Sequence, residues 1–81
     1  MNERDPLLAE REKTHGSFKT NAQIYMRLHH AAPFINMKDE HILAIEMIYM
    51  KLSRILSGQT NFKDHWDDIA GYAKLGSEAC D

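Results

Sequence analysis

Hydrophobic and polar positions follow one another along this chain with the spacing of α-helices. Apolar residues recur three and four positions apart, and no stretch shows the strict alternation of a half-buried strand. The predicted helices cover about residues 5–13, residues 17–31 with a start at residue 17 or 20, residues 40–56 and residues 62–75. The pattern predicts an all-α fold: one compact, bundle-like domain of four helices spanning residues 1–81, with an ordered core of about residues 5–76.

Capping and turn residues set the expected ends of these helices. Gly16 can adopt the left-handed conformation that ends the first helix. Asp39 is the expected N-cap of the third helix, and Thr60 or Asn61 is the expected N-cap of the fourth. Gly76 is expected to stop the fourth helix.

The third predicted helix is apolar around most of its circumference, which indicates a central position with neighbours on most sides. On a helical projection, Glu46 falls inside its apolar stripe. A buried carboxylate without a partner is costly, so Glu46 requires one. Two kinds of partner stay open. One is a metal ion; the other is a salt bridge or polar network with Lys51, Arg54 or an arginine of the N-terminal helix.

Three aspartates, Asp64, Asp67 and Asp68, lie in the first turns of the fourth predicted helix. Together with Glu46 they can supply the oxygen ligands that Mg²⁺ or Mn²⁺ prefers, because carboxylates on adjacent helices commonly build such sites. The alternative is that the aspartates only complement the helix dipole, which favours negative charge at a helix N-terminus. Both interpretations fit the spacing.

The turn between the first two helices reads Thr14-His15-Gly16-Ser17. A histidine, a glycine and two hydroxyls could cradle a phosphate, although the same residues suit a C-cap followed by an N-cap. Physical reasoning favours the capping interpretation. Further along, His65 is expected at a partly exposed rim beside Trp66.

Composition and charge narrow the function classes. A formal net charge of −2 argues against binding nucleic acid through a positive field. Cys80 is the single cysteine, which excludes a cysteine-based zinc site and fits a reducing compartment. No apolar run approaches the roughly 18 residues of a membrane span, and the charged N-terminus lacks a signal sequence. A cytoplasmic protein without membrane contact is expected.

Three segments, EREKTHGSF, EMIYMKLSRILSG and DHWDDIAGY, resemble a family of small phage and prophage proteins. That family is distantly similar to the MazG-like all-α nucleotide pyrophosphohydrolases, which use Mg²⁺ to cut nucleoside triphosphates between the α and β phosphates. Here the MazG-like EExxE and ExxD helices are represented by one glutamate and by DxxDD. The resemblance implies a homodimer whose two subunits share a groove.

The resemblance also assigns roles to residues. It implies Glu46 and Asp68 as catalytic metal ligands, joined in the metal site by Asp64 or Asp67. It implies phosphate contacts at Lys51 and Arg54, with His15 lining the nucleotide site. His65 and Trp66 complete the expected substrate-binding set.

The sequence thus predicts a phage-derived protein of the host cytoplasm that binds nucleotides or hydrolyses them with Mg²⁺. Whether it is an enzyme stays open, because a nucleotide-sequestering module without turnover fits the same residues. The alternative is a small interaction protein that inhibits a host defence or metabolic factor. Its surface would be formed by Asp64, His65, Trp66 and Asp67.

Overall fold

The computed structural model describes residues 5–81, apart from the side chains of Glu12 and Thr14. It contains four α-helices: α1 (Pro6–His15), α2 (Phe18–Ala31), α3 (Asp39–Leu56) and α4 (Lys63–Glu78). No strand occurs in this described part of the chain, so the all-α prediction is confirmed. None of the described helices combines the length and the hydropathy that crossing a membrane requires.

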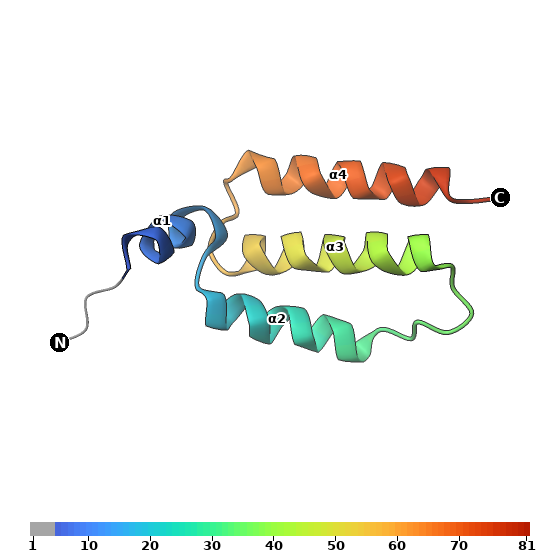
Figure 1. The fold of residues 1–81 in the computed structure, drawn as a ribbon, viewed down its shortest axis with the longest axis horizontal. Coiled ribbons are helices and arrows are strands. Elements are labelled where there is room, and N and C mark those ends of the chain that lie inside the picture. Colours follow the sequence, from blue (N-terminus) through green and yellow to red (C-terminus); the bar gives the residue numbers. More distant parts are fainter. Residues whose placement is uncertain (1–4) are drawn as a thin grey trace.

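Helix α3 is the centre of the fold. It packs against α2 on one side and against α4 on the other, and the three helices lie side by side (Figure 1). Helix α1 lies at one end of this layer, where α2 begins and α3 ends. The predicted central position of α3 is confirmed, but helices flank it on two sides and not on most sides.

The layered arrangement leaves a thin core. Ala44 and Ile55, both on α3, are the buried hydrophobic residues among the described ones, at 7% and 5% exposure. Large apolar side chains on the open sides of the layer remain in solvent, including Leu43 at 63% exposure and Leu56 at 66%. A layer one helix thick cannot cover both open sides of its central helix, so apolar surface remains available for a partner.

The turn between α1 and α2 is fastened to the C-terminal end of α3. Gly16 has a φ of 75°, as its expected left-handed conformation requires. The Asn21 side-chain amide donates to the carbonyl of Ser17 at 2.9 Å and to that of His15. Ser57 in turn donates its hydroxyl to Asn21 Oδ1 at 3.1 Å. These bonds hold the start of α2 and the end of α1 against α3.

Helix α4 does not end at Gly76, so the predicted stop is wrong. The helix continues to Glu78, and Gly76 faces α3, where an added Cβ would lie 3.6 Å from the Ala44 side chain. The Gly76 carbonyl also accepts a hydrogen bond from His41 Nε2 at 2.9 Å. Gly76 therefore lies inside the helix against α3, at a spacing where an added Cβ would make an ordinary van der Waals contact.

Two further capping predictions are corrected. Lys38 is the N-cap of α3, and Asp39 is its first helical residue. Helix α4 is preceded by Phe62 rather than capped by Thr60 or Asn61. The Thr60 hydroxyl instead donates to the carbonyl of Ile55 at 3.3 Å, where it satisfies an acceptor at the end of α3.

Candidate functional site

A cavity of about 320 Å³ lies between α1, α2 and α3. Its apolar walls are formed by Leu8, Phe18, Ala22, Met26 and Met50, and the remaining lining residues are Arg11, His15, Gly16, Asn21, Tyr25 and Arg54. Ligand sites typically measure about 300–1,000 Å³ and combine apolar walls with a few polar groups. The cavity matches that description at the small end of the range.

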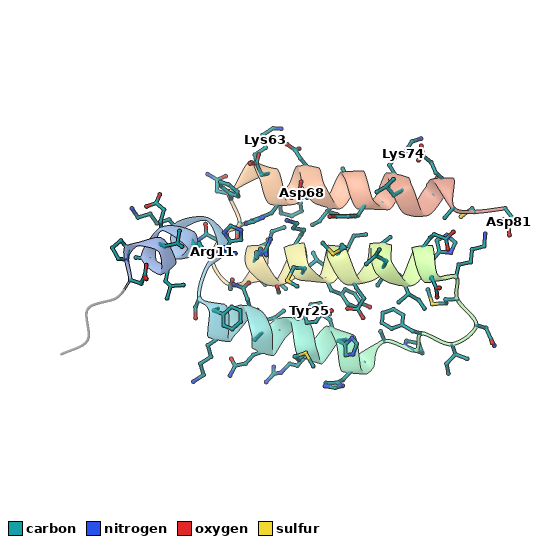
Figure 2. The ribbon with its side chains drawn as sticks, viewed as in Figure 1. Arg11, Tyr25, Lys63, Asp68, Lys74 and Asp81 are labelled. Atoms are coloured by element: carbon teal, nitrogen blue, oxygen red, sulfur yellow. The ribbon has the colours of Figure 1, made fainter. Side chains whose placement is uncertain are left out.

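The polar end of the cavity is cationic. Its positive charges are those of Arg54 from α3 and Arg11 from α1; Figure 2 shows Arg11 where α1 meets the end of the layer. Burial and the positive charge of Arg11 lower the pKa of Arg54, while the negative charge of Asp68 opposes this effect. Among the described residues, the Arg54 guanidinium makes no hydrogen bond or salt bridge. The lining includes no carboxylate in the part of the chain that the structure describes.

His15 stands at the junction of this cationic end and the fourth helix. Its Nδ1 lies 3.2 Å from the carbonyl of Arg11, and its ring meets the ring of His65 edge-to-face at 5.7 Å. Burial, followed by the positive charge of Arg54, lowers the pKa of His15 below its usual value of 6.5. At neutral pH the His15 ring is therefore uncharged in the folded protein.

The partners of Glu46 come from α2. The Tyr25 hydroxyl donates a hydrogen bond to Oε2 of Glu46, and Nδ1 of His29 lies 2.7 Å from Oε1. Only 16% of the Glu46 side chain is exposed. Burial alone would raise the pKa of Glu46, but the bonds from Tyr25 and His29 outweigh burial and lower it. A polar network thus satisfies the carboxylate, although neither expected base, Lys51 nor Arg54, belongs to it.

Two of the three aspartates of α4 form salt bridges. Asp68 Oδ2 lies 2.8 Å from Lys51 Nζ on α3, and this hydrogen bond lowers the pKa of Asp68. Asp67 pairs with Lys63 one turn earlier at 2.6 Å. Figure 2 shows Asp68 on the side of α4 next to α3, whereas Lys63 projects away from α3. Asp64 is exposed on the first turn of α4, where the helix dipole favours its charge.

The carboxylates predicted to bind metal are not brought together. Glu46 bonds to residues of α2, whereas Asp68 bonds to α3 from α4. Across the described residues, no group of three or more His, Cys, Asp and Glu side chains is placed to hold a metal ion. Mg²⁺ requires several oxygen ligands in near-octahedral geometry. The arrangement within one chain does not fit a magnesium centre, since these carboxylates would have to leave their present partners.

The residues expected to contact substrate divide into two groups. His15 and Arg54 both line the cavity. Lys51 is instead paired with Asp68, and Trp66 is half exposed on α4, where its Nε1 donates to the carbonyl of Thr60 at 2.9 Å.

His65 differs from its expected position at a partly exposed rim. Its side chain is only 2% exposed and packs against the rings of Phe62, at 4.8 Å between centroids, and His15. The expectation was wrong because His65 lies on the face of α4 that meets α3 and the α1–α2 turn, while Trp66, one residue later, points outward. An interaction surface on α4 therefore excludes His65.

Arg11, Tyr25 and His29 are the site residues that the sequence analysis did not single out. Tyr25 and His29 are four positions apart on α2, which places both on one face, and this spacing was the available signal. Arg11 carried no such signal, because its position over the cavity depends on how α1 folds back at Gly16.

Comparison with protein families places residues 3–80 in the range of one model, a domain of unknown function named DUF6378. The match covers nearly the whole chain. Neither curated proteins nor solved structures give a match.

Proposed function

The chain belongs to the DUF6378 family, and we propose that it binds nucleotides in the cavity between α1, α2 and α3. The observation that carries the proposal is Arg54, a part-buried guanidinium that faces this cavity without an ion-pair partner among the described residues. Phosphate groups bind at Arg54 and Arg11, and the nucleobase lies along the apolar wall near Phe18 and Tyr25.

Two physical arguments support this proposal. A guanidinium presents paired donors that match a phosphate, and the resulting bonds are charge-assisted. A part-buried charge without a partner also raises the free energy of the folded protein, which a bound anion lowers. The aromatic and methionine side chains of the wall suit a flat base, since they offer polarizable surface without demanding hydrogen bonds.

The sequence also raises the prediction that the protein hydrolyses the nucleotide it binds. The likeness to MazG-like enzymes supports Mg²⁺-dependent cleavage through Glu46 and Asp68, whereas the described geometry keeps these two carboxylates with separate partners. Binding is therefore the function that the geometry favours. Cleavage is tested in the same assay by adding Mg²⁺ or Mn²⁺ and following pyrophosphate release.

The test is isothermal titration calorimetry with a panel of ribo- and deoxyribonucleoside triphosphates. We expect saturable binding that is weakened by Arg54→Gln and unchanged by Lys74→Gln, a matched change at an exposed lysine of α4 (Figure 2). Pyrophosphate release that Glu46→Gln abolishes would add hydrolysis to binding. If no nucleotide of the panel binds the wild-type protein, the proposal fails.

We further propose that two copies associate through the open sides of α3. Leu43 and Leu56 are 63% and 66% exposed on this central helix. Burial of such side chains is worth about 1.5–3 kcal/mol each. Light scattering coupled to gel filtration should give twice the chain mass, and Leu43→Lys should shift the protein toward the monomer.

An interaction with a host protein is the second candidate function. The observation that favours it is Trp66, which is 50% exposed beside the acidic side chains of Asp64 and Asp67. Tryptophan at a protein surface is enriched among the residues that dominate binding energy. A single host protein that is retained stoichiometrically by the wild type, and lost with Trp66→Ala, would support this function.

A further inference from the structure

We propose that the cavity holds the phosphate of its ligand directly between Arg54, Arg11 and His15, with no divalent metal between phosphate and protein. This inference rests on the proposed nucleotide binding and adds the chemical form of the ligand. The site takes a metal-free phosphate or pyrophosphate group carried by an apolar or aromatic body.

The lining of the cavity is positively charged. The described lining contains two guanidinium groups and one imidazole as its ionisable groups besides the Tyr25 phenol. Guanidinium groups donate five hydrogen bonds and accept none, so they can hold phosphate oxygens but cannot ligate a metal. Mg²⁺ in a phosphate site is normally held by one or two carboxylates as well as by the phosphate.

The carboxylates expected as metal ligands, Glu46 and Asp68, are engaged by other residues. Both oxygens of Glu46 are already engaged, one by the Tyr25 hydroxyl and the other by His29. Tyr25 lines the cavity, whereas Glu46 is not among the described lining residues. Asp68 acts on Arg54 only through its field, since its hydrogen bond is made to Lys51 at 2.8 Å.

The two arginines of the lining repel each other. Arg11 of α1 and Arg54 of α3 both line the cavity, and burial together with the positive charge of Arg11 lowers the pKa of Arg54, so two positive groups from different helices converge here. An anion placed between them converts these repulsions into attractions. Because α1 and α3 each contribute, the same anion fastens α1 to the layer.

The experiment titrates ATP and inorganic pyrophosphate into the full chain in two buffers, one with EDTA and one with excess Mg²⁺. We expect both ligands to bind in EDTA at least as tightly as in Mg²⁺, because the metal competes with the arginines for phosphate oxygens. Arg54→Gln should weaken binding about 10- to 100-fold in EDTA, the cost of one charge-assisted contact. Arg54→Lys should restore part of the loss.

The outcomes separate this inference from the proposed function. Binding that appears only with Mg²⁺ or Mn²⁺ overturns the metal-free site and leaves nucleotide binding intact. Absence of binding in both buffers overturns both. Each variant is first compared with the wild type by circular dichroism and thermal unfolding, with Lys74→Gln as the control for charge removal elsewhere. If Arg54→Gln retains the wild-type melting temperature and the wild-type affinity in EDTA, the assignment of Arg54 fails.

Discussion

Gly16 lies directly against Ser57, although the two residues are far apart in sequence. A Cβ at Gly16 would overlap the Ser57 hydroxyl oxygen and lie 3.0 Å from the Ser57 carbonyl oxygen. Gly16 itself has a φ of 75°. The left-handed conformation and the close approach both require glycine, so this contact fixes where α1 and its cationic residues meet the cavity.

Gly16→Ala should therefore destabilise the protein by about 1–3 kcal/mol, the sum of backbone strain and steric overlap. Urea unfolding measures the change. The control is Gly71→Ala, because Gly71 is helical and a Cβ there has nothing within 4 Å. That variant should be neutral or more stable by up to about 1 kcal/mol. Equal effects of the two substitutions would contradict the role assigned to Gly16.

Tyr25→Phe should remove the hydrogen bond to Glu46 and leave a part-buried carboxylate oxygen without its donor. We expect a loss of about 1–3 kcal/mol in the free energy of unfolding. Tyr49→Phe serves as the matched control, since the Tyr49 hydroxyl makes no hydrogen bond among the described residues. If Tyr49→Phe lowers the free energy of unfolding by the same amount, the hydrogen bond from Tyr25 to Glu46 is not the cause of the loss.

Acid should weaken the fold through Glu46. Its pKa is lower in the folded protein than its usual value of 4.5, because the bonds from Tyr25 and His29 outweigh burial. The resulting stabilisation is complete above the usual pKa and is lost as pH falls through the folded pKa. Urea unfolding between neutral and acidic pH should show this loss in the wild type and a flatter profile in Glu46→Gln. Parallel profiles would exclude the predicted contribution.

Anion binding should be coupled to proton uptake at His15. Burial and the positive charge of Arg54 keep the pKa of His15 below 6.5, although the hydrogen bond to the Arg11 carbonyl opposes them. A phosphate in the cavity opposes these charges and raises that pKa, so affinity should increase as pH falls from about 8 to about 6. Calorimetry in buffers of different ionisation enthalpy measures how many protons the protein takes up when the anion binds. His15→Gln should abolish this proton uptake. Uptake that persists in this variant would place the proton elsewhere.

Asp68→Asn distinguishes a phosphate site from a metal site. Asp68 is paired with Lys51 and lies in the field of Arg54. Removal of its negative charge should strengthen anion binding about two- to fivefold in EDTA, as expected for a nearby exposed charge. A metal ligand would behave in the opposite way, since its loss would weaken binding that depends on Mg²⁺. Titration of pyrophosphate into the wild type and the variant shows whether the substitution strengthens or weakens binding.

Local signals were sufficient for much of the fold. The apolar circumference of residues 40–56 identified the central helix, and the left-handed requirement at Gly16 identified the first turn. Both properties belong to the chain itself, because side-chain spacing and backbone sterics act within a few residues. The need of Glu46 for a partner was visible for the same reason, since its place in an apolar stripe already implied burial.

The packing of helix against helix decided the rest. Gly76 could end α4 or lie within it, and the helix continues past it to Glu78 with Gly76 facing Ala44 of α3. Glu46 could meet a metal, a base or a polar network, and the neighbouring face of α2 supplied Tyr25 and His29. Arg11 and Arg54 share a cavity only because the turn at Gly16 is fastened to the end of α3. Sequence determines which groups require partners, whereas the faces that meet in space determine which partners they receive.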